Sequence, residues 1–443
     1  MNQQALLHVA GEPILGHLRM FRRDRVGMML ELAAAHPEIV EVSMGIVRRL
    51  VVVSAPALAN EVLVQRNAAF AKAPGLTIFL KPVLGDGLLT SEHRTHEKQR
   101  KLLAPAFAHK RIAGYATAMA ERAQRFTANW KEGQQVDVAE EMMKLTFEIV
   151  GKTLFDAEVG ADADVVGNAV EVAMNQAVAQ LGSPIPIPPF VPTPGNLRYR
   201  RAVGQLDEIV YRMIRERRQQ GGDRGDVLSM LLSAKDEAGD GMTDREVRDE
   251  SMTLFLAGHE TTANGLAWTF YLLARHPEVR ARLEAELDAL GHVPTYDDLK
   301  QLPYTIAVFK EAMRLYPPVY IIARRAIEDT VVGGRKIGKN AIVIINVVGL
   351  HKRADVFPDP ERFDPERFLG DRERQLPRGA YIPFSVGPRN CIGNHFALME
   401  AHLLLATIAQ RVRFELQRKA PAELEQLVTL RPKNGLPARV TLR

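Results

Sequence analysis

The chain has 443 residues, of which 46% are hydrophobic and 25% are charged. This apolar content excludes a disordered or fibrous chain, and the formal net charge of +5, interspersed along the sequence, is too small to mark a nucleic-acid-binding protein. Cys391 is the single cysteine, which excludes an intrachain disulfide, a multi-cysteine zinc site and an iron–sulfur cluster. Length alone would allow about three domains.

The sequence predicts no membrane anchor. No apolar run reaches the roughly 18 residues that a spanning helix needs. The first residues also lack the basic start and apolar core of a signal peptide. We therefore expect a soluble, cytoplasmic protein.

The first half of the chain mixes a short β-rich segment with helices. Residues 38–56 predict two strands around a turn, and the residues that follow favour helix. Six prolines between residues 184 and 194 exclude a helix interior or a central strand there. Amphipathic helices are predicted on both sides, over 164–181 and 196–220. The proline-rich segment is therefore either a stiff loop joining two helices of one body or an interdomain linker.

The longest helical pattern begins at Thr243, which forms a capping box with Glu246. It continues to about Arg275, where His276 and Pro277 end it. Its middle is apolar nearly all round, which favours a helix running through the core.

The remaining elements complete the predicted fold. Two further helices are predicted near 277–290 and 304–315, and a last one follows Cys391. We predict a mostly α chain with a minor β portion, forming a single catalytic domain over residues 1–443 without a fused reductase. The β portion is expected at about 38–56, 320–350 and 415–443.

The cysteine stands in an unusual context, Phe384-Ser-Val-Gly-Pro-Arg-Asn-Cys-Ile-Gly393. Gly387 and Gly393 permit a close backbone approach or a positive φ on either side of it. The helix predicted after Cys391 would stabilise a thiolate through its N-terminal N–H groups. Such a thiolate suits an axial ligand of haem iron. A cysteine buried as a small hydrophobic residue is the alternative.

This segment matches the pattern F-x-x-G-x-R-x-C-x-G in full, and the chain resembles the cytochrome P450 family of haem-thiolate monooxygenases. The resemblance implies haem b as cofactor and O₂ as co-substrate. It implies that the haem lies between the long central helix and the helix after Cys391. It further implies that Cys391 ligates the iron, Phe384 packs beside the sulfur and Arg389 contacts a haem propionate.

The family's E-x-x-R motif matches Glu311 and Arg314, which share one helix face. Glu97 and Arg100 have the same spacing, but only the later pair precedes Tyr-Pro-Pro and, further on, Phe-Asp-Pro-Glu-Arg-Phe. The resemblance implies that Arg367 joins this pair in a buried, structural ion network. The alternative is a solvated ion pair on a helix surface.

A second motif, Ala-Gly-His-Glu-Thr-Thr, stands in the middle of the long helix. Gly258 would let a flat ligand approach the backbone, and Thr261 can bond a carbonyl one turn back. The motif resembles the family's acid–alcohol pair, in which Glu260 and Thr261 would relay protons in the oxygen-binding groove. His259 is expected to be a neighbour rather than a ligand. Without the cysteine motif, the stretch would be an unremarkable threonine pair.

Basic residues elsewhere match the family's propionate partners. His96 and Arg100 share a helix face, with histidine where the family often has tryptophan. Arg324 fits the arginine that follows the E-x-x-R helix, and Arg325 is an open alternative.

Segments that line the substrate pocket in the family are dominated by apolar side chains here. This favours a lipophilic substrate such as a fatty acid, terpenoid, steroid or polyketide of secondary metabolism. We expect the proline-rich segment to belong to the lid over this pocket. The expected pocket residues are Ile78, Phe79, Phe255, Leu256, Val319, Ile321 and Val428.

No glycine-rich flavin or nicotinamide motif occurs in the sequence, so electrons are expected from a separate ferredoxin or flavodoxin with its reductase. Basic residues could dock an acidic partner of this kind. Two rival functions remain: a peroxide-driven peroxygenase or haem-thiolate isomerase, and a non-catalytic haem- or ligand-binding protein. The presence of both Glu260 and Thr261 favours the monooxygenase. The candidate docking residues are Lys98, Lys101, Arg372, Arg374 and Arg378.

Overall fold

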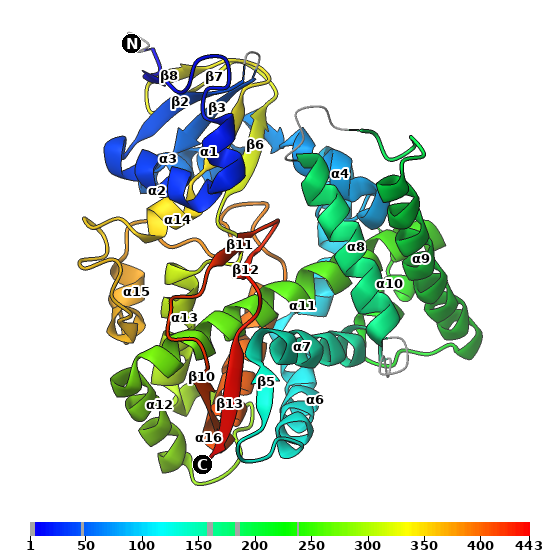
Figure 1. The fold of residues 1–443 in the computed structure, drawn as a ribbon. Helices are drawn as coiled ribbons and strands as arrows, with labels where there is room; N and C mark the ends of the chain where they lie inside the picture. The colour runs from blue at the N-terminus through cyan, green and yellow to red at the C-terminus, as the bar shows by residue number, and fades with distance from the viewer. Residues whose placement is uncertain (1–4, 46–47, 157–162, 182–186, 237–238) are drawn as a thin grey trace. The chain divides into compact units, whose positions relative to one another are not determined.

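The structure is a computed structural model that describes residues 5–45, 48–156, 163–181, 187–236 and 239–443 (Figure 1). The chain folds into two compact units, each built from several stretches of sequence. Unit 1 comprises Met1–Pro74, Ala307–Cys391 and Leu424–Arg431, and unit 2 comprises Gly75–Ile306, Ile392–Glu423 and Pro432–Arg443.

Unit 1 is built on a six-stranded sheet with the strand order β1-β2-β3-β9-β6-β4. Strands β2 and β3 form an antiparallel hairpin, and β9 joins β3 in parallel although it comes from a distant part of the chain. Valine and isoleucine side chains alternate between two apolar clusters, one on each face of the sheet. The strands are β1 (His8–Val9), β2 (Ile39–Met44), β3 (Arg48–Val53), β4 (Phe70–Lys72), β6 (Ile322–Ala326) and β9 (Ile342–Ile345).

The predicted strands at 38–56 and within 320–350 are confirmed, with one difference. Strand β9 stops at Ile345, and the apolar residues that follow form a short helix. The Asn346 side chain accepts a hydrogen bond from the Gly349 N–H at 2.9 Å, which begins that helix. The other elements that lie mainly in unit 1 are α1 (Leu18–Arg23), α2 (Arg25–Ala35), α3 (Pro56–Asn60), α13 (Pro303–Leu315), α14 (Val347–His351), α15 (Arg372–Gln375), β7 (Thr330–Val332), β8 (Arg335–Ile337), β11 (Leu424–Gln426) and β12 (Leu430–Pro432).

Unit 2 contains most of the helices and a small antiparallel sheet of order β10-β13-β5. Strand β5 lies outside the predicted β portion, because its three residues carry too little pattern to be recognised alone. The elements of unit 2 are α4 (Pro74–Leu84), α5 (His93–Leu103), α6 (His109–Ala128), α7 (Val138–Phe155), α8 (Ala163–Leu181), α9 (Pro194–Gln220), α10 (Val227–Ser233), α11 (Asp244–Arg275), α12 (Pro277–Leu290), α16 (Asn394–Arg411), β5 (Gln135–Asp137), β10 (Val412–Leu416) and β13 (Pro437–Leu442).

Helix α11 begins and ends where the sequence predicted. The Glu246 N–H donates to the Thr243 hydroxyl at 3.2 Å, and the Glu246 carboxylate accepts from the Thr243 N–H at 2.8 Å. The helix then runs without interruption to Arg275 and stops before Pro277. A capping box and a proline are local signals, which is why both ends could be read from the sequence.

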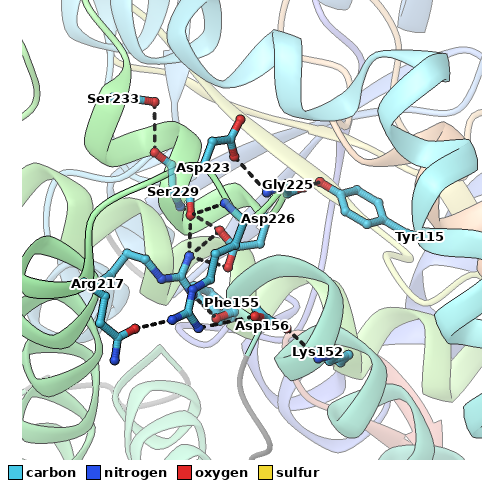
Figure 2. A network of polar contacts seen from close by, with 12 residues as sticks. Tyr115, Lys152, Phe155, Asp156, Arg217, Asp223, Gly225, Asp226, Ser229 and Ser233 are labelled. Atoms are coloured by element: carbon cyan, nitrogen blue, oxygen red, sulfur yellow. Dashed lines mark hydrogen bonds and ion pairs between the residues drawn. The ribbon is translucent and has the colours of Figure 1, made fainter.

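The C-terminal end of α9 is fixed by a buried arginine (Figure 2). The Arg217 guanidinium donates to both carboxylate oxygens of Asp226, at 2.6 and 2.5 Å, and to the Phe155 carbonyl at 2.9 Å. Asp226 also caps α10 by accepting from the Ser229 N–H at 2.7 Å. One ion pair therefore holds together the ends of α7 and α9 and the start of α10.

The proline-rich segment falls partly outside the described residues, at 182–186. Residues 187–193 form no regular element, and α9 begins at Pro194 with Thr193 as its N-cap. This agrees with the predicted loop between two helices. In the part of the chain that the structure describes, no helix is both long and apolar enough to cross a bilayer.

Candidate functional site

The loop that carries Cys391 is shaped by its own backbone. The Cys391 N–H donates to the Phe384 carbonyl at 2.9 Å, and the Asn390 N–H donates to the Gly387 carbonyl at 3.0 Å. Gly387 has a φ of +81°, and a Cβ there would come within 2.3 Å of the Leu63 carbonyl oxygen. Only glycine fits this position. The loop closes on itself and leaves Cys391 exposed.

Gly393 does not share the backbone strain that the sequence allowed for it. Its φ is −89°, which any residue adopts, and it serves as the N-cap of α16 without a side-chain hydrogen bond. Helix α16 therefore begins three residues after Cys391, as predicted, and its His395 N–H donates to the Asn394 side-chain oxygen at 2.7 Å.

Two arginines of unit 1 match the predicted partners of a carboxylate ligand. Arg389 is half-buried, and its guanidinium donates to the Asn67 side-chain oxygen at 2.5 Å. Arg324 is buried in β6. Its neighbour Arg325 donates instead to the Asn340 side chain at 2.9 Å. Because successive residues of a strand face opposite sides of the sheet, the structure favours Arg324 over Arg325 as the inward-facing cation.

Glu311, Arg314 and Arg367 come together in unit 1. Arg314 donates two hydrogen bonds to the Glu311 carboxylate, both at 2.7 Å, and both side chains are fully buried. The Asp364 N–H donates to the same carboxylate at 3.0 Å, and the Arg367 guanidinium lies 3.4 Å from it. Burial raises the pKa of Glu311, and the bonds from Arg314 oppose that rise. This is a network with its charges paired, not a solvated helical pair.

His351 links this network to the segment that leads to Cys391, and sequence reasoning missed it. Its carbonyl accepts a hydrogen bond from Arg314 at 3.0 Å, and its ring Nε2 accepts from the Ile382 N–H at 2.9 Å. Burial, with Arg314 nearby, lowers the pKa of His351 to about 3. The ring is therefore neutral and acts as an acceptor. A lone histidine ending an apolar run was the available signal.

Helix α11 presents one accessible stripe on an otherwise buried surface. From Val247 to Leu273 every residue is buried except Ala257, Gly258 and Thr261. These positions lie on one helix face. A Cβ on Gly258 would lie 3.2 Å from the side chain of Val150 in α7, so this glycine also admits close packing of α7.

The polar groups beside the stripe have distinct surroundings. The Thr261 hydroxyl donates to the Ala257 carbonyl at 2.8 Å, as predicted, and the helix stays continuous there. Glu260 is buried. His259 bonds the Phe255 carbonyl at 2.8 Å and packs edge-to-face on Phe147 of α7, and burial lowers its pKa. It therefore faces α7 and not the stripe.

Glu400 of α16 is a second group that the sequence analysis did not single out. It is fully buried, and neither carboxyl oxygen has a hydrogen-bond partner of ordinary geometry among the described residues. Burial raises the pKa of Glu400 to about 8, and the neighbouring Thr262 hydroxyl opposes that rise. The signal was a single carboxylate among apolar residues on one helix face.

The predicted propionate partners of unit 2 lie on α5. His96 is buried and Arg100 is half-buried, one turn apart. Lys98 on the same helix pairs with Asp236 at 2.8 Å. Its charge is therefore partly neutralised, which weakens the expectation that it docks an acidic partner.

Of the other four expected docking residues, two lie near carboxylates and two are exposed. In unit 1, Arg372 lies 3.4 Å from Glu366 and Arg374 lies 3.1 Å from Asp371. Lys101 and Arg378 are exposed. The five residues are divided between the two units.

Three of the predicted pocket residues belong to segments that the structure ties together in unit 1. The Leu430 N–H donates to the Pro318 carbonyl and the Tyr320 hydroxyl donates to the Leu427 carbonyl, both at 2.9 Å. These bonds place the segments that carry the half-buried residues side by side. The three residues are Val319, Ile321 and Val428.

The pocket residues expected in unit 2 give a mixed result. Leu256 is buried in α11, and Ile78 is 56% exposed on α4. The side chain of Phe79 lies outside the described residues. The ring of Phe255 packs on Phe147 of α7 at a centroid distance of 4.9 Å, and Phe255 also lines a small apolar cavity with Leu206 of α9 and Leu228 of α10. Its place in the substrate pocket stays a prediction.

Comparisons with known proteins give this arrangement a family. The family model described as Cytochrome P450 matches residues 9–437, and the chain belongs to the cytochrome P450 family. The chain is 38% identical to the cyclooctat-9-en-7-ol 5-monooxygenase of Streptomyces melanosporofaciens, over 90% of this chain and 87% of that protein. It is 33% identical to the pentalenene oxygenase of Streptomyces avermitilis, over 97% and 96% of the two chains.

A solved structure, the haem domain of cytochrome P450DA, superimposes with a TM-score of 0.92 at 32% identity. The alignment covers 100% of this chain and 98% of that one. The fold is therefore the cytochrome P450 fold, and the protein is a cytochrome P450 monooxygenase. Members of this family use haem and O₂, act on lipophilic substrates and take electrons from redox partners.

The residues present fit a haem. An exposed thiol stands on a loop whose shape depends on Gly387, and α11 is accessible only at a stripe of small residues and one threonine within its buried stretch. Thiolate is the haem ligand that favours O–O cleavage.

Proposed function

We propose that this chain hydroxylates or epoxidises a terpenoid, using haem b held by the thiolate of Cys391. The observation that carries the proposal is the accessible stripe of α11. At this stripe the Thr261 hydroxyl stands next to the buried Glu260, within a stretch of helix that is otherwise buried. When bound, the haem supplies the electron-transfer and dioxygen chemistry of the reaction. Inserting one oxygen atom into a C–H bond consumes two electrons and two protons and releases the second oxygen atom as water.

The chain's cations would hold the two haem propionates. In unit 1 we assign this role to Arg324 and Arg389, since one is buried on the inner side of its strand and the other is oriented by Asn67. In unit 2 we assign it to His96 and Arg100, which share a face of α5. Charge-assisted hydrogen bonds of this kind fix a carboxylate in orientation.

Thr261 and Glu260 would hold and move the protons. The Thr261 hydroxyl donates to the Ala257 carbonyl, so its oxygen lone pairs remain available as acceptors on the accessible face. Glu260 is one residue away and can replace a proton that the hydroxyl passes on. A peroxygenase would not need this pair, so its presence supports the oxygen-dependent reaction.

The substrate class rests on the pocket and on the relatives. Val319, Ile321 and Val428 offer hydrocarbon surface and no ionisable group. The two bacterial relatives are named for oxidising cyclooctat-9-en-7-ol and pentalenene. A leukotriene-B4 omega-hydroxylase of Mus musculus is also 33% identical over 84% of this chain. A fatty acid would carry a carboxylate, and none of these pocket residues pairs with one, so we favour a terpenoid.

The electrons would come from a separate ferredoxin or flavodoxin with its reductase. The sequence contains no glycine-rich motif for a flavin or a nicotinamide.

A substrate-induced spin-state shift tests this proposal. The purified haem protein is titrated with cyclic diterpenes, sesquiterpenes, long-chain fatty acids and macrolides, and its optical spectrum is recorded. We expect saturable shifts with terpenoids, and an oxidised terpenoid when a ferredoxin, its reductase and NADPH are added. A shift and turnover with fatty acids but not with terpenoids would contradict the substrate class. Turnover with peroxide but not with ferredoxin, its reductase and NADPH would contradict the reaction type.

A further inference from the structure

The turn that joins helix α4 to helix α5, residues 85–91, is held by two buried carboxylates of α11. The Asp86 N–H donates to the Asp249 carboxylate at 2.9 Å, and the Leu88 N–H donates to the Glu250 carboxylate at 3.0 Å. Asp249 is 4% exposed and Glu250 is 0% exposed. Burying a carboxyl group is costly, so two of them directed at one turn indicate that the turn must stay in one position.

This α4–α5 turn lies directly on the surface of α11. A Cβ on Gly85, which has a φ of +56°, would come within 2.0 Å of the Asp249 carboxyl group. A Cβ on Gly87 would come within 2.2 Å of the Thr253 hydroxyl oxygen and 2.5 Å of the Asp249 carbonyl oxygen. Only glycine allows the turn to approach the helix this closely.

The charge of Asp249 is balanced by an arginine that also reaches α9. Arg248 donates to the Asp249 carboxylate at 3.0 Å, and its Nε donates to Asp207 of α9 at 2.6 Å. Arg248 is itself 5% exposed. Separating buried, paired charges would leave one of them unpaired, which is unfavourable. The α4–α5 turn is therefore fixed to α11 and, through Arg248, to α9.

The same turn is attached to α5 through Gln99. The Gln99 side-chain amide donates to the Asp86 carbonyl at 2.5 Å, and its oxygen accepts from the Ser91 hydroxyl at 2.5 Å. The Thr90 hydroxyl donates to the Gly85 carbonyl at 2.7 Å and closes the turn. The peptide groups of Asp86 thus bond α11 through the N–H and α5 through the carbonyl.

Gln99 lies on α5 between the two residues assigned to the haem propionates. It follows His96 by three positions, which places both on one helix face, and it directly precedes Arg100. His96 and Gln99 are 7% and 4% exposed. A rotation or slide of α5 that breaks the Gln99 bonds would move His96 and Arg100 as well. Their orientation relative to α11 therefore depends on the α4–α5 turn.

We propose that the α4–α5 turn positions His96 and Arg100 for the haem propionates, with Gln99 and Glu250 as positioning residues of the haem site. The inference rests on the proposed propionate role of His96 and Arg100. It adds that their alignment is set from α11, the helix that also carries the accessible stripe. Residues that orient a ligating group change the affinity of a site by about 10- to 100-fold.

The rate at which haem leaves the folded protein tests this inference. The ferric protein is mixed with excess apomyoglobin, and haem transfer is followed by absorbance. Gln99→Met keeps the length of the side chain but removes both bonds to the turn, and Glu250→Met removes the acceptor of the Leu88 N–H. We expect each variant to speed haem transfer about tenfold. Glu250→Gln keeps an acceptor oxygen and should restore the rate to within about twofold of the unaltered protein.

A buried ion pair elsewhere in unit 2 separates positioning from stability. Asp226→Asn weakens the pair with Arg217 (Figure 2), so it should lower the urea midpoint at least as much as Gln99→Met does. It should leave the rate of haem transfer within about twofold, because the pair does not contact α5 or the turn. Glu97→Gln, at an exposed position of α5, should change neither quantity. Haem transfer that rises in every variant in proportion to lost stability would overturn the inference.

Variants of the propionate partners separate this inference from the proposed function. His96→Ala and Arg100→Ala should speed haem transfer and shift the propionate bending bands of the resonance Raman spectrum. Gln99→Met should shift the same bands in the same direction. Effects in His96→Ala and Arg100→Ala but not in Gln99→Met or Glu250→Met would overturn the positioning role and leave the propionate partners in place. Unchanged transfer in all four variants would contradict the propionate partners, and the inference with them.

Discussion

Two fully buried glutamates, one in each unit, illustrate how differently the protein treats a carboxyl group. Glu311 in unit 1 accepts two hydrogen bonds from Arg314 and one from a backbone N–H, with Arg367 nearby. Glu400 in unit 2 has no partner of ordinary geometry among the described residues and is influenced only weakly by Thr262. The first keeps its charge because that charge is paired, and the second avoids its charge by keeping its proton.

The difference separates a structural region from a proton-holding one. In unit 1, hydrogen bonds connect Glu311 through Arg314 to His351 and on to the Ile382 N–H, which precedes Cys391 in the chain. The network therefore stabilises the segment that leads into the cysteine loop. In unit 2, Glu400 lies beside Thr262 of α11, and burial raises its pKa to about 8, so that it holds a proton at neutral pH.

The largest effect is expected from Arg314→Leu. It removes both Arg314 hydrogen bonds from the buried Glu311 carboxylate and leaves only Arg367 and the Asp364 N–H beside it, so the free energy of unfolding in urea should fall by about 3–5 kcal/mol. Arg374→Leu is a matched control, because Arg374 and Asp371 have the same spacing but side chains 86% and 75% exposed. It should cost less than about 1 kcal/mol. Equal losses in the two variants would contradict the structural role of the buried network.

Glu400→Gln should change how stability depends on pH. The pKa of Glu400 is about 8 in the folded chain and about 4.5 in the unfolded chain. Between these two pH values, the folded state therefore holds a proton that the unfolded state has lost. Stability is therefore fully present below pH 4.5 and falls as pH rises towards 8. Glu400→Gln should abolish that fall and stabilise the protein at pH 7 by about 3 kcal/mol, measured by urea unfolding across pH. An unchanged pH profile would show that Glu400 is already ionised in the folded protein.

His351→Gln tests the opposite sign in unit 1. The pKa of His351 is about 3 in the folded chain and about 6.5 in the unfolded chain. The stability that the neutral ring contributes is therefore present above pH 6.5 and lost as the pH falls towards 3. Gln can still accept from the Ile382 N–H but takes up no proton. At pH 5 the variant should be more stable than the unaltered protein by about 2 kcal/mol, relative to their difference at pH 8. Parallel unfolding curves at both pH values would rule out a buried neutral imidazole.

Thr261→Ala should affect chemistry and not stability. Removing the hydroxyl on the accessible stripe should lower the product formed per electron consumed at least about tenfold. Thr262→Ala is the control on the buried face, and it should leave this ratio within about twofold. NADPH consumption and product yield are measured together in the reconstituted system. A Thr261→Ala protein that couples electrons to product as well as the unaltered protein would contradict the proton relay.

Local signals made much of the fold readable from the sequence. The capping box and the His276–Pro277 stop define α11, and the alternating apolar residues of the first hairpin define β2 and β3. Strands β4 and β5 were not predicted, since three residues carry no period and their pairing depends on distant parts of the chain. The same reason explains β9, whose last predicted residues became α14 through a side-chain cap.

The candidate site likewise contains residues that local motifs identified and residues whose role depends on tertiary packing. The motif around Cys391 and the residues of the E-x-x-R network were found because their spacing is fixed along the chain. Arg324 could not be separated from Arg325 until the sheet placed them on opposite faces. His351 and Glu400 were missed because their importance lies in what surrounds them, and burial is a property of tertiary packing.

The central claim is that Cys391 supplies the thiolate that holds the haem, and the optical spectrum of the reduced protein under carbon monoxide tests it most directly. The unaltered protein should show the red-shifted Soret band of a thiolate-ligated haem. Cys391→His should bind haem but lack that band, while its circular dichroism stays unchanged. A Cys391→His protein that retains the red-shifted band would contradict the account.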